Sequence, residues 1–329
     1  MHTVFRRTQA VRIAAHLRAH DNILVAAHAN PDGDALGSSS AAGWILQALG
    51  KRFALYNASG LPSAYVWLQA PGPFYDRLDS LPFAPELVLC LDCGDAQRLG
   101  PELAQCLDSM TSINIDHHLG NPHFASLENW VEPEMAATGQ LVAEVARAAD
   151  LPLHGAMAEG IALALVSDTG SFSFGGISAD LFHLMAELVA GGLELGLLCE
   201  RMNKNWTASK SRLWGLLLSR LAPQLDNRLL LVTISQADMA ACQSTAEDLE
   251  GFVELLRRHK TVEIAALLRE ETPTRCKLSL RSFGETDVRK IALRFGGGGH
   301  KNAAGAHMRQ PLHEARASVL AVTGEHLGA

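Results

Sequence analysis

The sequence predicts an α/β protein made of two domains joined by a helical linker. Its 329 residues exceed the usual size of one domain. Short apolar runs alternate with helical patterns in the first half, and two consecutive strand-like runs follow a helical pattern in the second. We expect a parallel sheet with helices on both faces over residues 1–190, a helical linker over residues 191–224, and a smaller α/β domain with a mixed sheet over residues 225–329.

The first domain is expected from four apolar runs separated by helical patterns, which is typical of a parallel sheet covered by helices. The runs are ILVAA (23–27), FALY (53–56), ELVLCL (86–91) and TSINI (111–115). Residues 155–167 form a mostly apolar run of thirteen residues, and this length favours a helix over a strand. Another helix is expected from Ser178, with Gly191 and Gly192 as its stop.

The linker and the second domain are expected from the patterns that follow. Residues 194–222 suggest two helices with a basic, Trp-containing surface, which suits a connector. A strand is expected at residues 228–235, a long helix over residues 244–260, and strands at residues 262–270 and 275–283. In the last strand, period-two geometry predicts one packed face and one cationic face, the latter formed by Arg275, Lys277, Ser279 and Arg281.

Composition restricts the function classes. A net charge of −7 argues against a protein that coats long duplexes, whereas a short nucleic acid or a nucleotide stays possible. No apolar run approaches the roughly 20 residues of a membrane span, and the N-terminus lacks a signal-peptide core, so we expect a cytoplasmic protein without a membrane partner. Cys90 and Cys93 form a C-x-x-C at the end of a strand-like run, which favours packing over redox chemistry.

The stretch HANPDGDALGSSSA, residues 28–41, places His28, Asp32 and Asp34 just beyond the first expected strand. Open α/β sheets bind ligands at that edge. Neighbouring carboxylates repel one another unless a cation or protons compensate them, and an added imidazole makes a plausible half of a metal site. The alternative is an Asn-Pro-Asp-Gly turn in which Asp34 caps a helix.

The same residue types recur at the ends of other elements. Asp92 follows the run at residues 86–91, and Asp116, His117 and His118 follow the run at residues 111–115. Asp168 ends the apolar run before SDTGSF. Packing does not explain such convergence at one edge of a sheet. We therefore predict a metal centre.

Oxygen ligands with two imidazoles and no thiolate favour Mn²⁺ or Mg²⁺ over structural zinc. A carboxylate that bridges two such ions allows them to activate water and to clamp a phosphoryl oxygen, which predicts phosphoester hydrolysis. Asp92 is the expected bridge, because its cluster is the poorest in other ligands.

The segment GGGGHKNAAG, residues 296–305, is the second unusual stretch. Four consecutive glycines suit neither a helix nor a strand, so we expect a loop whose amides approach an anion, aided by His300 and Lys301. No Walker A spacing is present. Together with Arg281, this loop suggests a second site for a phosphate or a nucleotide; the alternative is a flexible solvated loop.

These segments resemble the motifs of the DHH phosphoesterase superfamily. HANPDGDALGS, LDCGD, DHHLGN and SDTGSF are similar to its four motifs, and RSFGETDVRKIALRFGGGGHKNAAG is similar to the DHH-associated C-terminal domain. The resemblance covers nearly the whole chain and is strongest to the short two-domain NrnA-type oligoribonucleases. Those enzymes degrade very short RNAs and dephosphorylate 3′-phosphoadenosine 5′-phosphate.

The resemblance implies a role for each matching residue. Two Mn²⁺ ions would be held by His28, Asp32, Asp34, Asp92, His117 and Asp168, with Asp92 as the bridge and part of the catalytic group. His118 would lie near the scissile phosphate, and Asp116 would support it. The terminal phosphate or nucleotide would contact Arg281, Ser282, Gly297, Gly298, Gly299, His300 and Lys301. Residues 137–140, Ala-Thr-Gly-Gln, depart from the Ser-Thr-Gly-Glu frequent in the family, which puts no ligand in doubt.

Four alternatives stay open. A cyclic-dinucleotide phosphodiesterase usually carries membrane and sensory segments, which we do not find in this sequence. A pyrophosphatase or polyphosphatase shares the first four motifs but should lack the GGGGHKNAAG segment. A single-strand DNA exonuclease of the RecJ kind is usually much longer. A nucleotide-sensing binding protein without turnover would need a lost ligand, and none is missing. We expect a short single-stranded RNA or nucleotide as substrate, and a homodimer is possible.

Overall fold

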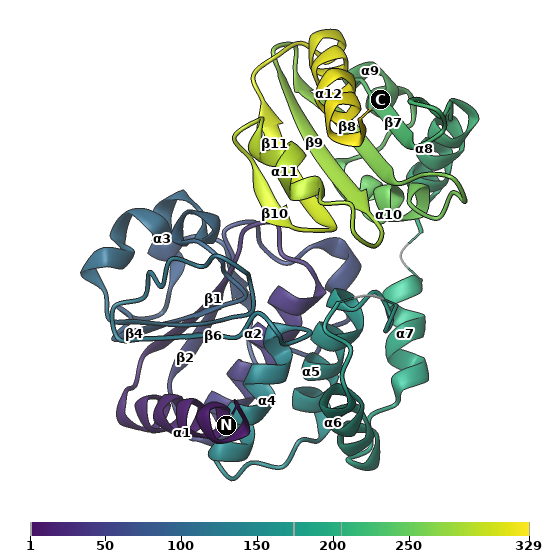
Figure 1. Ribbon diagram of the computed structural model, residues 1–329. Coiled ribbons are helices and arrows are strands. Elements are labelled where there is room, and N and C mark those ends of the chain that lie inside the picture. The colour runs from purple at the N-terminus through teal and green to yellow at the C-terminus, as the bar shows by residue number, and fades with distance from the viewer. Residues whose placement is uncertain (1, 174, 205, 329) are drawn as a thin grey trace. The chain divides into compact units, whose positions relative to one another are not determined.

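The computed structural model describes residues 2–173, 175–204 and 206–328, and it divides the chain into two compact units, residues 1–205 and residues 206–329 (Figure 1). The helices expected for the linker fall on both sides of this division. Helix α7 (Leu195–Asn203) packs on α5 (Gly155–Asp168) in unit 1, whereas α8 (Ala208–Ser219) contributes to the core of unit 2.

Unit 1 contains a six-stranded sheet in which every neighbouring pair is parallel, as predicted. Its order is β3-β2-β1-β4-β5-β6. The four expected runs form the four central strands, and two short strands that the sequence analysis did not anticipate lie at the edges. The bounds are β1 Ile23–Ala27, β2 Phe53–Tyr56, β3 Phe74–Tyr75, β4 Leu87–Leu91, β5 Ser112–Asp116 and β6 Glu128–Val131.

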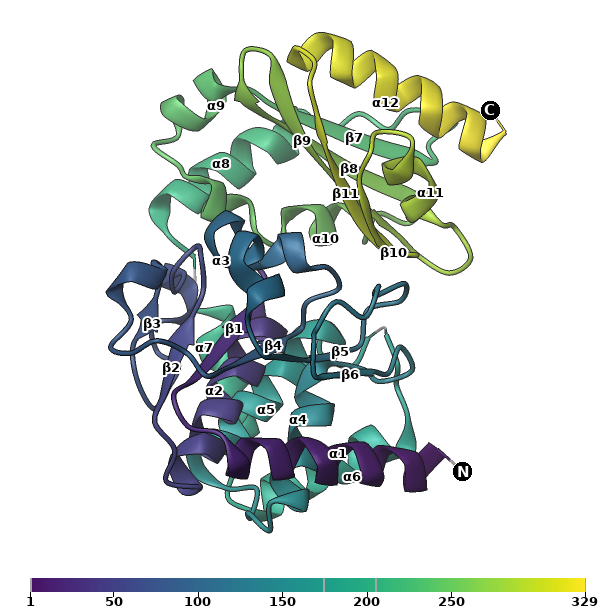
Figure 2. The ribbon, with the colours of Figure 1, turned by 90° about the vertical axis from the view of Figure 1, so that its left-hand side faces the viewer.

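Helices cover both faces of this sheet, because the strands are apolar on both sides. Leu24, Val88 and Cys90 face α3 (Pro101–Cys106) and the short turns beside it, while Val25 and Leu89 face the larger helical layer. Figure 2 shows these two layers on opposite sides of the strands. The larger layer consists of α1 (His2–Ala19), α2 (Gly33–Ala48), α4 (Thr138–Ala148) and α5, with α6 (Ala179–Ala190) outside it.

Cys90 and Cys93 are both buried and unpaired, which confirms packing as the role of the C-x-x-C pair.

Helices α2 and α5 pack closely because glycines form their contact. A Cβ at Gly37 would lie 2.3 Å from the carbonyl oxygen of Gly160, and a Cβ at Gly160 would lie 2.8 Å from that of Gly37. A Cβ at Gly33 would lie 2.6 Å from the Cβ of Ser167. The start of α2 is therefore held against the end of α5.

Unit 2 contains the mixed sheet that was expected, in the order β10-β11-β9-β8-β7, with β7 and β8 parallel and the other pairs antiparallel. Helices α11 (Val288–Leu293) and α12 (Leu312–Leu327) pack on one face. Helices α8 and α10 (Phe252–Leu256) cover part of the other, and α9 (Gln236–Ala241) follows β7. The strands are β7 Leu229–Ile234, β8 Ile264–Thr272, β9 Arg275–Ser282, β10 Gly298–His300 and β11 Ala303–Met308.

Two expectations for unit 2 were wrong. The long helix over residues 244–260 is a 3-10 turn, Ala246–Leu249, followed by α10, because Gly251 adopts a left-handed φ of 81° between them. The glycine segment is not a loop throughout, since residues 298–300 form the edge strand β10. Glycines are needed for this pairing, because a Cβ at Gly297 would lie 2.0 Å from the carbonyl oxygen of Gly305.

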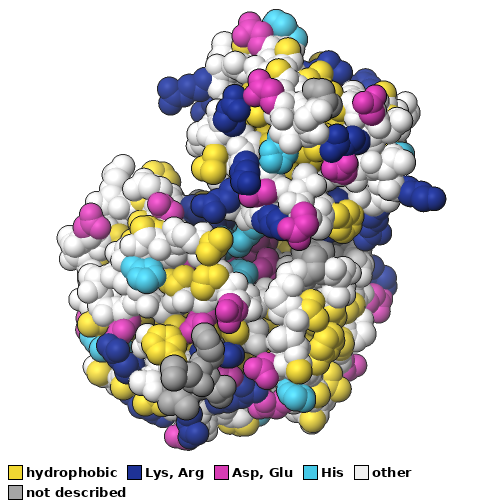
Figure 3. All heavy atoms as spheres, viewed as in Figure 1, with side chains coloured by type: hydrophobic (Ala, Val, Ile, Leu, Met, Phe, Trp, Pro, Cys, Tyr) yellow, Lys and Arg dark blue, Asp and Glu magenta, His cyan; other side chains and the backbone are white. Residues whose placement is uncertain are grey.

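Among the described residues, no single helix has the length and apolar composition of a membrane span. Helices α6 and α7, with a sharp bend between them, meet both criteria only when they are taken together. Helix α6 also carries apolar side chains on its outer face, including Phe182 and Val189. Figure 3 shows this hydrophobic surface over α6.

Candidate metal centre

The acidic and imidazole residues predicted from the sequence gather at one edge of the sheet in unit 1. His28 directly follows β1, Asp92 directly follows β4, and Asp116 is the last residue of β5. Strand β1 leads into α2 on one face, while β4 leads toward α3 on the other. The cluster therefore lies at the switch point where open parallel sheets bind ligands. Asp168, the last residue of α5, joins them through His117.

Asp92 lies between two groups of possible metal ligands. Its Oδ2 is 3.4 Å from Nε2 of His28, and its Oδ1 is 3.6 Å from Nε2 of His117. One group is His28, Asp32 and Asp92, and the other is Asp34, Asp92 and His117, each with ligand atoms close enough to share one ion. Asp168 lies 3.2 Å from Nε2 of His117. The structure thus brings all six predicted ligands together.

Both histidines are turned so that Nε2 faces the carboxylates. Nδ1 of His28 lies 3.0 Å from the carbonyl oxygen of Ala29, and Nδ1 of His117 lies 3.1 Å from that of Met135. A backbone carbonyl that accepts from Nδ1 fixes the ring and leaves Nε2 as the donor atom for a metal, which is the usual arrangement of ligating histidines.

Asp34 is wholly buried and is held by hydrogen bonds from three directions. Its Oδ1 accepts from the hydroxyl of Ser38 at 2.8 Å and from the amide of Gly139 at 3.0 Å, and its Oδ2 accepts from the amide of Thr138 at 2.7 Å. The residue that caps α2 is Asp32, whose Oδ1 accepts from the amides of Asp34 and Ala35. The alternative in which Asp34 is the cap is therefore wrong.

The carboxylates and imidazoles perturb one another strongly because they are buried together. Burial opposes a charge on His28, but hydrogen bonds to Asp32 and Asp92 outweigh it and raise the pKa of the imidazole to about 10. Burial likewise opposes a charge on His117, yet Asp168, Asp34 and Asp92 raise its pKa to about 9. Protons therefore compensate the carboxylates in the metal-free protein.

The pKa values of the carboxyl groups diverge for the same reason. Burial and the charges of Asp32 and Asp92 raise the pKa of Asp168 to about 7, against the influence of His117. Burial also acts to raise the pKa of Asp92, but the three surrounding imidazoles hold it far below its usual range. Asp92 stays ionised, which suits a carboxylate that bridges two cations.

His118 is held by a separate set of side chains. Its Nδ1 donates to Oδ1 of Asp116 at 2.7 Å, and Nδ2 of Asn121 donates to Oδ2 of Asp116 at 2.6 Å. Nη1 of Arg98 lies 3.1 Å from Nε2 of His118. Arg98 therefore contacts the imidazole of His118.

The residues of the cluster fit a pair of divalent cations. Four buried or half-buried carboxylates and two imidazoles offer the oxygen and nitrogen ligands that Mn²⁺ and Mg²⁺ accept. Asp92 presents a different oxygen to each ligand group, as a bridging carboxylate would.

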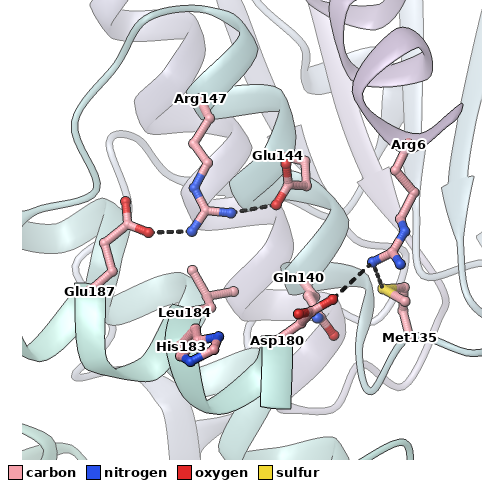
Figure 4. Close-up of a pocket in the computed structure, with 9 residues that line it drawn as sticks. All are labelled: Arg6, Met135, Gln140, Glu144, Arg147, Asp180, His183, Leu184 and Glu187. Atoms are coloured by element: carbon pink, nitrogen blue, oxygen red, sulfur yellow. Dashed lines mark hydrogen bonds and ion pairs between the residues drawn. The ribbon is translucent and has the colours of Figure 1, made fainter. Parts of the chain in front are cut away.

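A cavity of about 270 Å³ is lined in part by Met135, the residue whose carbonyl oxygen contacts Nδ1 of His117. Figure 4 shows its charged side chains paired with one another: Arg147 contacts Glu144 and Glu187, and Arg6 contacts Asp180 and the sulfur of Met135. None of the predicted metal ligands lines this cavity. The cavity is separate from the candidate centre.

The predicted substrate-binding residues of unit 2 lie where β9 ends and where β10 turns into β11. Arg281 pairs with Glu254 at 2.7 Å, and Lys301 pairs with Glu285 at 2.7 Å. Ser282 is wholly buried; its hydroxyl donates to the carbonyl oxygen of Thr286 and accepts from Nδ2 of Asn302. This burial favours a structural role for Ser282. Gly297 precedes the strand formed by Gly298, Gly299 and His300.

Sequence reasoning missed the residues that support the ligands, most of them through backbone groups. The amides of Thr138 and Gly139 hold Asp34, the hydroxyl of Thr138 donates to Asp92 at 3.3 Å, and the carbonyl of Met135 holds His117. The only sequence signal for these contacts is the Ala-Thr-Gly-Gln segment, which was noted as a departure from the family pattern.

Comparison with known proteins gives matches along nearly the whole chain. Residues 22–166 match the DHH family, N-terminal domain, and residues 231–324 match the DHHA1 domain. The chain is 33% identical over 306 residues to the bifunctional oligoribonuclease and PAP phosphatase NrnA of Thermus thermophilus, covering 93% of this chain and 90% of that protein. It is 23% identical to the probable bifunctional oligoribonuclease and PAP phosphatase NrnA of Streptococcus mutans, covering 90% of this chain and 92% of that protein.

Among solved structures, an exopolyphosphatase-related protein from Bacteroides fragilis superposes with a TM-score of 0.85 at 26% identity, covering 97% of this chain and 95% of that one.

Proposed function

This chain belongs to the DHH family, with a DHH domain followed by a DHHA1 domain, and on that premise we propose that it is a metal-dependent phosphoesterase acting on short oligoribonucleotides. We include linear dinucleotides and 3′-phosphoadenosine 5′-phosphate among its substrates. The relatives that share most of its length are named as oligoribonucleases and PAP phosphatases, which supports this choice of substrates.

The position of Asp92 carries the proposal. Its two oxygens face two different imidazoles, at 3.4 Å and 3.6 Å, so one carboxylate belongs to both ligand groups. The two ligand groups that share Asp92 would hold a pair of divalent cations, which would supply an activated water and neutralise charge on a phosphoryl group. A centre of this kind suits hydrolysis of a phosphoester and requires no other cofactor.

The surrounding side chains have distinct tasks in this reaction. His28, Asp32, Asp34, His117 and Asp168 complete the two ligand groups around Asp92. His118, held by Asp116 and facing Arg98, lies 3.5 Å from Asp92 and is placed to orient a phosphate at the centre. Arg98 adds a positive charge next to His118, which favours an anionic substrate there.

The basic residues of unit 2 bind the substrate in this proposal. Arg281, His300 and Lys301 provide charge and hydrogen-bond donors for a terminal phosphate. A grip on one end of the substrate limits the length that can be cleaved productively. It therefore accounts for a preference for short substrates. Contacts to one end need no extended basic surface, which agrees with the net charge of −7.

The test is hydrolysis by metal-stripped protein to which Mn²⁺ or Mg²⁺ is returned. Substrates are a labelled RNA dinucleotide, 3′-phosphoadenosine 5′-phosphate, pyrophosphate and a single-stranded DNA. We expect turnover of the first two. In Asp92→Asn we expect a loss of about a thousandfold or more, because both ligand groups lose their shared carboxylate and removal of one member of a catalytic unit costs at least this much. Asp150→Asn is the matched control. Asp150 and Asp92 both have a left-handed φ, 60° and 53° respectively, but the side chain of Asp150 is exposed. Wild-type activity in Asp92→Asn, or turnover of pyrophosphate alone, would contradict the proposal.

Three finer statements stay predictions. We propose that the resident ions are manganese, that two copies of the chain associate, and that the protein is cytoplasmic. Elemental analysis of protein purified without added metal, light scattering across a concentration series, and cell fractionation measure these in turn.

A further inference from the structure

Phe283 is an exposed aromatic residue that the catalytic proposal does not use. It follows β9 directly, and 49% of its surface is exposed although the side chain is entirely apolar. The guanidinium carbon of Arg257 lies over the ring, 4.1 Å from its centroid, and Arg257 itself is buried. The ring is thus supported by a buried cation on one side and is partly open to solvent.

Hydrogen bonds hold the backbone on both sides of Phe283. Nη1 of Arg257 donates to the carbonyl oxygen of Ser282 at 3.3 Å, directly before Phe283 in the chain. Nδ2 of Asn302 donates to the carbonyl oxygens of Gly284 and Thr286, on the other side of Phe283. A ring carried by a held backbone and contacted by Arg257 has less conformational entropy to lose when a ligand packs against it.

The same contacts join this turn to the predicted phosphate-binding residues. The amide of Ser282 donates to the carbonyl oxygen of Asn302 at 3.0 Å, and the amide of Val288 donates to that of Lys301 at 2.8 Å. Phe283 and the His300–Lys301 turn therefore lie at the same edge of the sheet in unit 2. An aromatic surface and phosphate-binding groups occur side by side there.

A nucleotide has the two features that this edge of unit 2 matches: a flat aromatic base and a phosphate. Base stacking on an aromatic side chain tolerates any base, because each base has a π face. We propose that Phe283, supported by Arg257, is a stacking surface for a nucleobase of the substrate; this rests on the proposed function and names the part of unit 2 that recognises the base.

The experiment compares Phe283→Leu, Phe283→Tyr and the wild-type enzyme on an RNA dinucleotide and on two analogues, each lacking the base at one end. Phe182→Leu is the matched control, because Phe182 is 50% exposed on α6 in unit 1. Loss of stacking corresponds to a rise in KM of about 5- to 150-fold. We expect this rise in Phe283→Leu with kcat nearly unchanged, recovery in Phe283→Tyr, and no effect in Phe182→Leu.

The analogues separate stacking from a general effect of the substitution. In the wild-type enzyme, removal of the stacked base should raise KM as much as Phe283→Leu does, and the two changes together should add nothing further. The proposal is overturned if Phe283→Leu leaves the KM of the dinucleotide unchanged. It is also overturned if Phe283→Leu raises KM equally for both analogues. Quenching of a 2-aminopurine dinucleotide by metal-free protein, lost in Phe283→Leu, supports stacking independently of turnover. If the wild-type enzyme cleaves none of these substrates, the proposed function fails instead, while the quenching still reports on Phe283.

Discussion

The contact between α2 and α5 links the stability of unit 1 to its metal affinity, and Gly37→Ala tests this link. Gly37 lies one turn after Asp34 on α2, while Asp168 is the last residue of α5. A Cβ at Gly37 would lie 2.3 Å from the carbonyl oxygen of Gly160 and 2.9 Å from the amide nitrogen of Ala164. Both neighbours are backbone atoms of α5, so the helix has to move.

The size of the effect follows from these distances. An ordinary contact at this point requires roughly 1 Å more separation between the helices. Overpacking of this kind costs about 1–3 kcal/mol, which exceeds the gain of about 0.5–1 kcal/mol from alanine in a helix. Metal ligands tolerate errors of only about 0.2 Å, so the displacement also separates Asp34 from Asp168 and lowers metal affinity by about 10- to 100-fold.

The assay is urea unfolding combined with calorimetric titration of Mn²⁺. Gly196→Ala is the matched control, because Gly196 lies in α7 of the same unit and a Cβ there meets nothing within 4 Å. We expect Gly196→Ala to be neutral or slightly stabilising, with unchanged metal affinity. The reasoning is refuted if Gly37→Ala unfolds at the same urea concentration as Gly196→Ala and binds the metal as tightly.

Two further predictions concern the same centre. Metal binding should displace the protons of His28 and His117, whose metal-free pKa values are raised to about 10 and about 9. Both groups are protonated near pH 8, so titrations in two buffers of different ionisation enthalpy should show release of at least two protons. Asp34 is a further source, because burial and the charge of Asp92 raise its pKa. Metal affinity should rise with pH until both histidine pKa values are passed. Thr138→Ala removes the hydroxyl that donates to Asp92, and calorimetry should show metal affinity about tenfold lower, with Thr138→Ser restoring it. Release of no protons, or an unaffected Thr138→Ala, would contradict these expectations.

Much of unit 1 follows from the sequence because its signals are local. Buried parallel strands such as β4 (Leu87–Leu91) are continuous apolar runs, and the polar residue directly after each run lies at the ligand-binding edge. This rule placed Asp92, His117 and their neighbours correctly. It could not find the amides of Thr138 and Gly139, because every residue except proline carries an amide and no side-chain pattern marks the two that face Asp34.

Unit 2 was harder to predict because tertiary contacts override its local preferences. Glycine disfavours strands, yet Gly299 pairs with β11, where a Cβ would lie only 2.5 Å from the carbonyl oxygen of Ala303. The helical pattern of residues 244–260 is interrupted at the left-handed Gly251, and the indole of Trp214 donates to the carbonyl oxygen of Asp248 just before it. Helix α8 appeared to be a connector because its basic residues are visible in the sequence, whereas the burial of Leu213 and Leu217 is not.

The crowding of His28, Asp32 and Asp34 into seven positions follows from where the chain turns. The end of β1 places His28 beside Asp92, and its imidazole is fixed by the next carbonyl. Asp32 uses one oxygen to cap α2, which leaves its second carboxylate oxygen for a ligand. Asp34 then occupies the first turn of the helix, where its buried carboxylate receives amides from α4 and faces His117. Capping and metal binding are therefore compatible tasks of the same turn, and a substitution such as Asp32→Ser, which keeps a cap but removes the carboxylate, separates them.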